Sequence, residues 1–441
     1  MSILGALKMF PAFGGTKTRY NALRQLAFLN AEHLKRFSPK TLDLVHKTLF
    51  TNLSKLSPKK NVMIVAGEAS GDIYGARLVL ALKELAPDIT FFGLGGPEME
   101  NAGVRVIHQV SDLSVVGLTE IIPRIRHISR VLSDFKKALK GNPPDLLILI
   151  DYPGFNLNLA KKAHSLGIPV FYYIPPQVWA WRERRVKKIG RRVDRVAVIL
   201  PFEREFYQKH GFEAEYVGHP LLDLSLPSKD KNEIRKDLGI SCEHDPILAL
   251  LPGSRAEEII RLMPAMTDAA EIISRSYPRL CCILPLASTV GEDLVKPYLE
   301  NVTVDIRIGR SDTKELLKIA DLALIASGTA TLEAAIMETP MVITYKVSPL
   351  TYFFGRFLVK VSYIGLVNLV AGKAIIPELI QGNATGSRLA EEGLAILENG
   401  GMRKEMKKEL QLVKEQLGRG GASKKAASIA GEMMGLEVQS D

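Results

Sequence analysis

The stretch Val62-Met63-Ile64-Val65-Ala66-Gly67-Glu68-Ala69-Ser70-Gly71-Asp72 decides the fold class. Its first residues form a short apolar run, which is typical of a strand buried on both faces of a parallel sheet. Beyond the glycine turn, Ala76, Leu80 and Leu85 fall near one helical face, so the pattern predicts a strand, a turn and a helix. Open α/β folds bind ligands at this edge of the sheet, and Glu68 places a carboxylate there. The alternative is a plain strand-to-helix connection in which the glycines serve only the backbone geometry.

Units of this kind recur along the chain. Apolar runs that end in polar, Gly-rich or Pro-rich turns start at Thr90, Leu146, Val170 and Arg195, and a second series starts at Ile247, Cys281, Leu322 and Met341. The alternation of strand and helix patterns predicts two doubly wound, Rossmann-like α/β domains. Two such domains that face each other leave a cleft between their strand edges.

The changes in pattern divide the chain into four parts. Residues 1–60 are a basic N-terminal extension, residues 61–225 and 226–390 are the two α/β domains, and residues 391–441 form C-terminal helices. For these last helices we consider packing back on the N-terminal domain.

The net charge of +10 is concentrated in the extension. Residues 1–60 hold 11 Lys and Arg against Glu32 and Asp43, so the rest of the chain carries only +1. A nucleic-acid-binding body would carry its own basic face, so we expect no nucleic-acid partner. A helix that begins at Ser38 and Pro39 is basic and amphipathic, and either a membrane surface or the body of the protein could receive it.

Cysteine and histidine usage favours a reducing compartment and no metal. The three cysteines, two of them adjacent as Cys281-Cys282, provide neither a disulfide framework nor a metal-binding spacing. No uninterrupted apolar run reaches the roughly 20 residues of a membrane span. No pair of histidines stands at ligand spacing, so we expect neither a metal nor a cofactor.

Two turns in the second domain are suited to phosphates. Ser327-Gly328-Thr329-Ala330-Thr331 lies between a strand and a helix, where backbone N–H groups and the positive helix end favour an anion. Glu333 follows in the first helical turn, where its carboxylate could accept hydrogen bonds from ribose hydroxyls. The second turn is Pro252-Gly253-Ser254-Arg255. The alternative for the first turn is a capped helix in which Glu333 complements the helix dipole.

Asp151 follows an apolar strand, where a carboxylate can act as a general base toward a substrate hydroxyl. Because parallel strands end at a shared edge, we expect Glu68, Asp151 and Gln177 to converge. Trp179 stands near Gln177 and Arg182, and aromatic, amide and guanidinium groups together suit a sugar phosphate. A structural cap is the competing role for Asp151, and a core position is the competing role for Trp179.

Seven segments, in chain order, resemble the lipid-A-disaccharide synthase family. They are Ala66-Gly67-Glu68-Ala69-Ser70-Gly71-Asp72, Gly95-Gly96-Pro97-Glu98-Met99, Asp151-Tyr152-Pro153-Gly154-Phe155-Asn156, Pro175-Pro176-Gln177-Val178-Trp179-Ala180-Trp181-Arg182, Val217-Gly218-His219-Pro220-Leu221, Leu251-Pro252-Gly253-Ser254-Arg255 and Ser327-Gly328-Thr329-Ala330-Thr331-Leu332-Glu333. The segment at 175–181 is highly specific. The resemblance runs from about residue 61 to 390 and leaves residues 1–60 unexplained.

The resemblance implies an inverting, metal-independent glycosyltransferase of the two-domain GT-B type. Such an enzyme joins UDP-2,3-diacylglucosamine to 2,3-diacylglucosamine 1-phosphate through a β-1,6 bond and releases UDP, in lipid A biosynthesis. The N-terminal domain would hold the acylated acceptor, for which Gln177, Trp179 and Arg182 are candidates. The C-terminal domain would hold the UDP-sugar.

The resemblance also implies roles for single residues. Asp151 would be the base for the acceptor 6-hydroxyl, Glu68 an acidic residue important to activity, and Arg255 the neutralising charge for the leaving diphosphate. Asn368 and Gln381, in segments that also resemble the family, would border the nucleotide.

The enzyme would work as a peripheral membrane protein on the cytoplasmic face of the inner membrane, and could form a homo-oligomer. Two alternatives stay open, namely another GT-B enzyme acting on UDP-N-acetylglucosamine and a non-catalytic nucleotide-sugar-binding membrane protein.

Overall fold

The computed structural model describes residues 59–113, 121–181, 183–224, 226–241, 244–286, 290–309, 312–349, 352–353 and 361–436. The predicted basic helix that begins at Ser38 therefore lies outside the described residues, as does Arg182. None of the helices in the described ranges is both long and apolar enough to span a bilayer.

The N-terminal half is built on a parallel sheet of seven strands in the order β3-β2-β1-β4-β5-β6-β7. The strands are β1 (Asn61–Ala66), β2 (Thr90–Gly95), β3 (Val104–Gln109), β4 (Leu146–Ile150), β5 (Val170–Tyr173), β6 (Arg195–Val198) and β7 (Glu215–Tyr216). Every residue of β4 is fully buried, as an uninterrupted apolar run predicts for a central parallel strand. The strand order reverses between β1 and β4, which makes their carboxyl ends the ligand-binding position of an open sheet.

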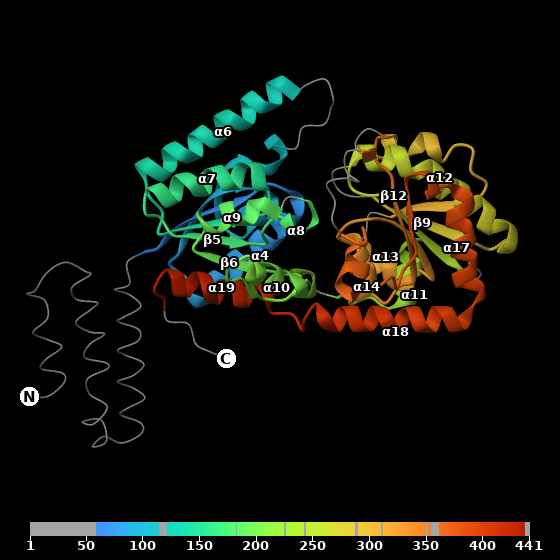
Figure 1. Cartoon of the computed structure of the whole chain (residues 1–441). Coiled ribbons are helices and arrows are strands. Elements are labelled where there is room, and N and C mark those ends of the chain that lie inside the picture. The colour runs from blue at the N-terminus through green and yellow to red at the C-terminus, as the bar shows by residue number, and fades with distance from the viewer. Residues whose placement is uncertain are drawn as a thin grey trace, which may run out of the picture.

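The C-terminal half repeats this plan in a parallel sheet of six strands, in the order β10-β9-β8-β11-β12-β13. The strands are β8 (Ile247–Leu251), β9 (Cys281–Pro285), β10 (Asp305–Gly309), β11 (Leu322–Ala326), β12 (Met341–Tyr345) and β13 (Glu378–Ile380). The two sheets confirm the expected pair of doubly wound α/β units (Figure 1).

Helices cover both sheets. Around the first sheet lie α4 (Ala69–Leu85), α5 (Pro97–Asn101), α6 (Ile121–Gly141), α7 (Pro153–Ser165), α8 (Val178–Trp181), α9 (Val186–Gly190) and α10 (Pro201–Lys209). The second half holds α11 (Lys231–Asp237), α12 (Ala256–Ser276), α13 (Thr313–Ile319), α14 (Ala330–Ile336), α16 (Leu366–Ala371) and α17 (Gly386–Glu398). The last helices are α18 (Gly400–Gln416) and α19 (Ala422–Met433).

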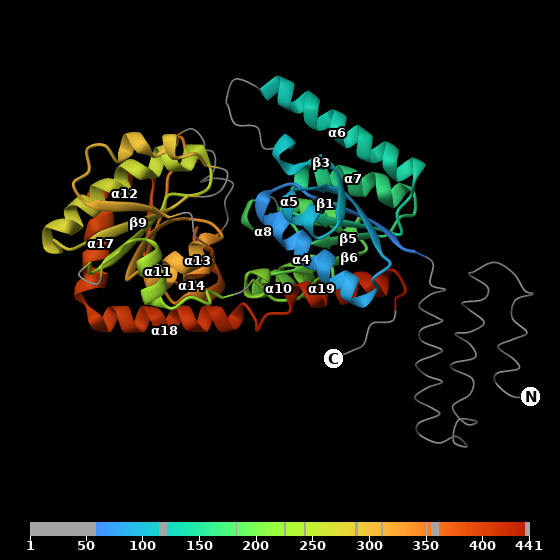
Figure 2. The ribbon, with the colours of Figure 1, turned by 180° about the vertical axis from the view of Figure 1, so that it is seen from behind.

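The two last helices connect the halves. Helix α18 packs on α14 and α16 of the C-terminal half, and the chain then crosses to α19, which packs on α4 of the N-terminal half (Figures 1 and 2). A backbone hydrogen bond holds this crossing, in which His219 N donates to Leu417 O at 2.9 Å. The Asp223 carboxylate also accepts from Ala422 N at 3.0 Å and Ser423 N at 2.6 Å, so it caps the start of α19.

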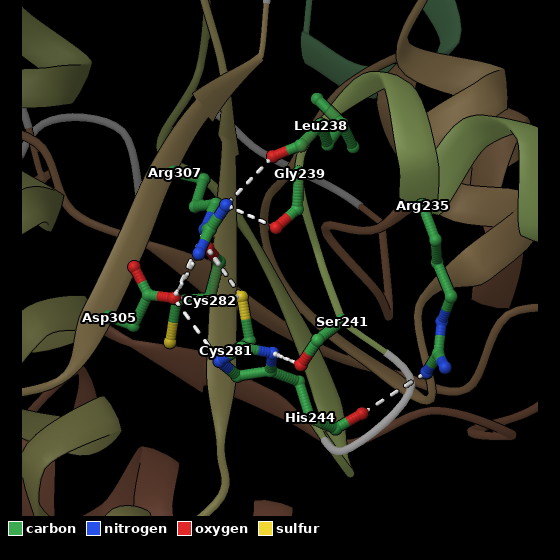
Figure 3. A network of polar contacts seen from close by, with 9 residues as sticks. All are labelled: Arg235, Leu238, Gly239, Ser241, His244, Cys281, Cys282, Asp305 and Arg307. Carbon is green, nitrogen blue, oxygen red and sulfur yellow. Dashed lines mark hydrogen bonds and ion pairs between the residues drawn. The ribbon is translucent and has the colours of Figure 1, made fainter.

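A polar network lies where β9 and β10 begin, at the edge of the second sheet that faces away from the strand carboxyl ends (Figure 3). The Asp305 carboxylate accepts from Nε and an Nη of Arg307, each at 3.0 Å, and lies 3.4 Å from His244 Nε2. Arg307 also donates to Leu238 O and Gly239 O. Cys281 and Cys282 are both fully buried beside this network, so they act as small apolar residues of the core.

Candidate functional site

The turn after β1 places Glu68 at the carboxyl edge of the first sheet and Asp72 beneath it. The Asp72 carboxylate is buried and accepts from the backbone N–H groups of Gly96 (2.6 Å), Glu98 (3.0 Å) and Met99 (3.1 Å). Asp72 therefore caps the start of α5, whereas Glu68 stays half-buried at the surface of the cleft.

The turn after β4 carries Asp151 in an unusual backbone conformation. Asp151 and Tyr152 both have φ of 45°, in the left-handed region that residues other than glycine rarely adopt. The Asp151 carbonyl accepts from the Tyr172 hydroxyl at 2.6 Å and from Asn156 Nδ2 at 2.7 Å.

Asp151 is mostly buried, and burial raises its pKa to about 6. This pKa is the net result of several causes: burial and the nearby Glu68 carboxylate raise it, while the backbone N–H of Tyr152 and the Arg255 guanidinium lower it. The structure therefore brings Glu68, Asp151 and Arg255 together from three turns. Gln177 is exposed in the turn after the neighbouring strand β5.

Arg255 of the C-terminal half reaches Glu68 of the N-terminal half. An Nη of Arg255 lies 3.8 Å from Oε2 of Glu68, and its other Nη lies 3.6 Å from Oε1 of Glu258. The Arg255 side chain is 69% exposed, so water screens both ion pairs and the guanidinium can exchange partners at little cost.

The turn Gly253-Ser254-Arg255, expected to hold phosphate, already holds a carboxylate. Oε2 of Glu258 accepts from Ser254 N at 3.1 Å and Arg255 N at 3.3 Å, which closes the start of α12. A phosphate that used these two N–H groups would have to displace Glu258. The sequence carries a local signal for this contact, since a Glu three residues after an N-cap is the usual capping pattern.

The turn at residues 327–331 is fixed by side-chain hydrogen bonds, and it has backbone N–H groups without an acceptor in the described part of the chain. Ser327 Oγ donates to Ile364 O at 2.8 Å, and Oγ of the fully buried Thr331 donates to Gly328 O at 2.8 Å. Within the described residues, the N–H groups of Gly328, Thr329 and Ala330 have no acceptor. These three N–H donors, together with the start of α14, form a site suited to binding an anion.

Glu333 lies behind these donors near the junction of the halves. Burial raises the pKa of its carboxyl to about 7, and Lys314 partly offsets the effect. Lys314 is itself buried and donates to Leu221 O of the N-terminal half at 3.2 Å. No group of three His, Cys, Asp or Glu in the described ranges is arranged to hold a metal ion.

Asn368, expected to border the nucleotide, is engaged within the protein. Its side chain is fully buried, with Nδ2 donating to Ile376 O and Glu378 Oε1 and Oδ1 accepting from the N–H groups of Ile375 and Ile376. All the bonds that this amide makes here are thus to the protein, and its contact with a nucleotide stays a prediction. Asn368 also fixes the Glu378 carboxylate, which accepts from Ile364 N at 2.8 Å. Ile364 in turn accepts the hydrogen bond from Ser327 Oγ through its carbonyl.

Gln381 and Trp179 are also engaged within the protein. Both amide atoms of Gln381 bond the backbone of Val347, at 2.7 and 3.2 Å, so the side chain braces a loop. Trp179 is only 9% exposed, and its Nε1 donates to the buried carboxylate of Glu203 at 2.9 Å. The core alternative for Trp179 thus describes its surroundings, and substrate contacts of Gln381 and Trp179 stay predictions.

A family profile identifies the chain. The profile described as lipid-A-disaccharide synthetase matches residues 62–433. The chain belongs to this family. Its activity is that of a lipid-A-disaccharide synthase, a glycosyltransferase of lipid A biosynthesis, and its substrates are lipid A precursors.

Individual lipid-A-disaccharide synthases agree with the profile. The chain is 44% identical to that of Geobacter sulfurreducens over 86% of this chain and 98% of the relative. It is 46% identical to that of Syntrophus aciditrophicus over 84% of this chain and 97% of the relative. The resemblance found in the sequence is therefore confirmed.

Solved structures share the two-domain fold at low identity. A UDP-GlcNAc 2-epimerase from Neisseria meningitidis bound to UDP-GlcNAc matches with a TM-score of 0.62 and 12% identity, covering 84% of this chain and 100% of its own. The calicheamicin glycosyltransferase CalG4 matches with a TM-score of 0.54 and 13% identity, covering 86% and 98%. These similarities confirm the GT-B-like architecture and concern the fold alone.

Proposed function

We propose that the chain is an inverting transferase that joins UDP-2,3-diacylglucosamine to 2,3-diacylglucosamine 1-phosphate and releases UDP. Residues 61–225 hold the acylated acceptor and residues 226–390 hold the UDP-sugar in this proposal. The observation that carries it is the position of Asp151, a mostly buried carboxylate opposite Arg255 at the junction of the two sheet edges.

Asp151 takes the proton of the acceptor 6-hydroxyl as that oxygen attacks the anomeric carbon from the face opposite UDP. The new glycosidic bond forms as the bond to the diphosphate breaks, and the electron pair leaves on UDP. Asp151 suits this step because a base with a pKa of about 6 is ionised at neutral pH and still accepts a proton readily. Burial is the main cause of that raised pKa, and Glu68 adds to it.

The departing diphosphate gains negative charge, which positive groups must offset. The Arg255 guanidinium and the N–H groups of Gly328, Thr329 and Ala330 supply this stabilisation in our proposal. The N–H groups of Ser254 and Arg255, in the same turn as Gly253, join them when Glu258 moves aside. Glu333 accepts from the ribose. Gln177 and Arg182 bind the acceptor sugar phosphate.

The acyl chains of both substrates place the reaction at a lipid surface. We propose a peripheral attachment at the cytoplasmic face of the inner membrane, to which the basic residues 1–60 contribute. A homo-oligomer is compatible with this arrangement.

The test is the mass of the product formed from the two diacylated substrates. A disaccharide 1-phosphate with four acyl chains is expected, together with one UDP per turnover. Turnover of UDP-N-acetylglucosamine alone, with no disaccharide, would overturn the proposal. Replacing Asp151 by Asn should lower kcat by about 100-fold while UDP affinity is kept, as for loss of a general base.

A further inference from the structure

We propose that Tyr172 and Asn156 are positioning residues that hold the Asp151 carboxylate in its reactive direction by clamping the Asp151 backbone carbonyl. This inference rests on the proposed role of Asp151 as base. Neither Tyr172 nor Asn156 reaches the cleft, because both side chains are fully buried. They can influence the reaction only through the residue that they hold.

The clamp closes on a backbone that would otherwise relax. Asp151 and Tyr152 are consecutive residues in the left-handed region, with ψ of 62° at Tyr152. A conformation of this kind persists only where the surrounding structure imposes it. The direction of the Cα–Cβ bond depends on φ and ψ, so relaxation of either residue would turn the Asp151 carboxylate away.

Four hydrogen bonds fix the peptide groups on both sides of Asp151. Its carbonyl accepts from the Tyr172 hydroxyl at 2.6 Å and from Asn156 Nδ2 at 2.7 Å, and Nδ2 also donates to Ile150 O at 3.0 Å. Asp151 N donates to Ile174 O at 3.0 Å. The first three bonds come from two side chains, Tyr172 and Asn156, which can be changed without altering the main chain.

The sheet register explains why Tyr172 can do this. Tyr172 is paired with Leu149 on the adjacent strand β4, two residues before Asp151. Its ring rises along the same face as Leu149, and the hydroxyl reaches the carbonyl just beyond the end of β4. The neighbouring Tyr173 points to the opposite face and belongs to the other core cluster.

Tyr172→Phe removes one hydroxyl and tests the clamp. We expect kcat to fall about 10-fold, with KM for both substrates and the affinity for UDP unchanged, because a small misplacement of a reacting group costs rate. The acid limb of the kcat profile should also move to lower pH, since a carboxylate released toward water loses the burial that raises the pKa of Asp151. Asn156→Ala should act in the same direction.

The matched control is Tyr207→Phe, which removes another buried hydroxyl that has no hydrogen-bond partner among the described residues. In an Asp151→Asn background, Tyr172→Phe should cause no further loss of turnover. Equal kcat values and pH profiles for the Tyr172 and Tyr207 variants would overturn the clamp while the proposed base stands. Wild-type turnover of Asp151→Asn would instead overturn the base and the clamp together.

Discussion

A Cβ atom on Gly67 would lie 2.2 Å from Cγ of Tyr152, so the turn after β1 and the turn after β4 fit only because residue 67 has no side chain. Gly67 has an ordinary φ, and its requirement is close approach. The glycine in the opening sequence stretch thus serves the backbone that carries Asp151.

Replacing Gly67 by Ala should force Tyr152 to move. Overpacking of this kind costs about 1–3 kcal/mol of stability, and we expect kcat to fall as the Asp151 turn is displaced. Thermal unfolding and initial rates check both effects. Gly154→Ala is the control, since its Cβ would meet nothing within 4 Å, and a comparable loss there would rule out the steric explanation.

Asp151→Asn should stabilise the protein above pH 6 even as it lowers activity. Burial raises the pKa of folded Asp151 to about 6, so folding favours the protonated carboxyl, and stability is lost as pH rises from about 4 through 6. The Asn variant has no carboxyl to ionise, so its free energy of unfolding at pH 8 should exceed that of the wild type by about 1–3 kcal/mol. Denaturant unfolding at pH 4 and pH 8 measures it; an advantage equal at both pH values would contradict the titration.

Glu258→Gln should bind UDP more tightly. The Glu258 carboxylate occupies two N–H groups and pairs with Arg255, all of which we assign to the diphosphate. Removing its charge should raise UDP affinity about threefold, the scale of a helix-terminus charge effect. Titration calorimetry checks the change. Glu257→Gln, on the same first turn, should leave the affinity unchanged, and weaker UDP binding by Glu258→Gln would show that Glu258 assists the diphosphate.

Arg255→Ala should weaken UDP binding by about 10-fold or more, as expected for loss of a charged hydrogen-bond donor. The Arg255 guanidinium lowers the pKa of Asp151, so its removal should also move the acid limb of the kcat profile to higher pH. Arg261→Ala, which removes an arginine paired with Glu257 on the same helix, is the control. If the acid limb does not move, Arg255 does not influence the pKa of the catalytic base.

Much of the fold follows from sequence patterns because buried parallel strands leave a plain signal. The runs at Val62 and Leu146 are uninterrupted and end in turns, so their pairing at one edge brought Glu68 and Asp151 together as expected. Sequence patterns say less where polar side chains serve the backbone. Asn368 resembles a ligand contact in the sequence, yet its side chain also bonds three backbone groups of a neighbouring loop.

The clamp residues were missed for a similar reason. Tyr172 reads as one more apolar position in a strand, and only the register of β5 against β4 shows where its hydroxyl ends. The capping role of Glu258 can be predicted from the sequence, since it depends on local spacing alone. The contact of Glu203 with Trp179 cannot be predicted in this way, because it joins two separate helices.

The packing of α19 on α4 has a consequence for synthesis in the cell. Helix α4 is among the first described elements to leave the ribosome and α19 is the last, so the face of α4 that receives α19 stays uncovered until translation has passed Met433. Such a long wait favours capture of the nascent chain by chaperones. In a chain stalled before α19, that face of α4 would stay open.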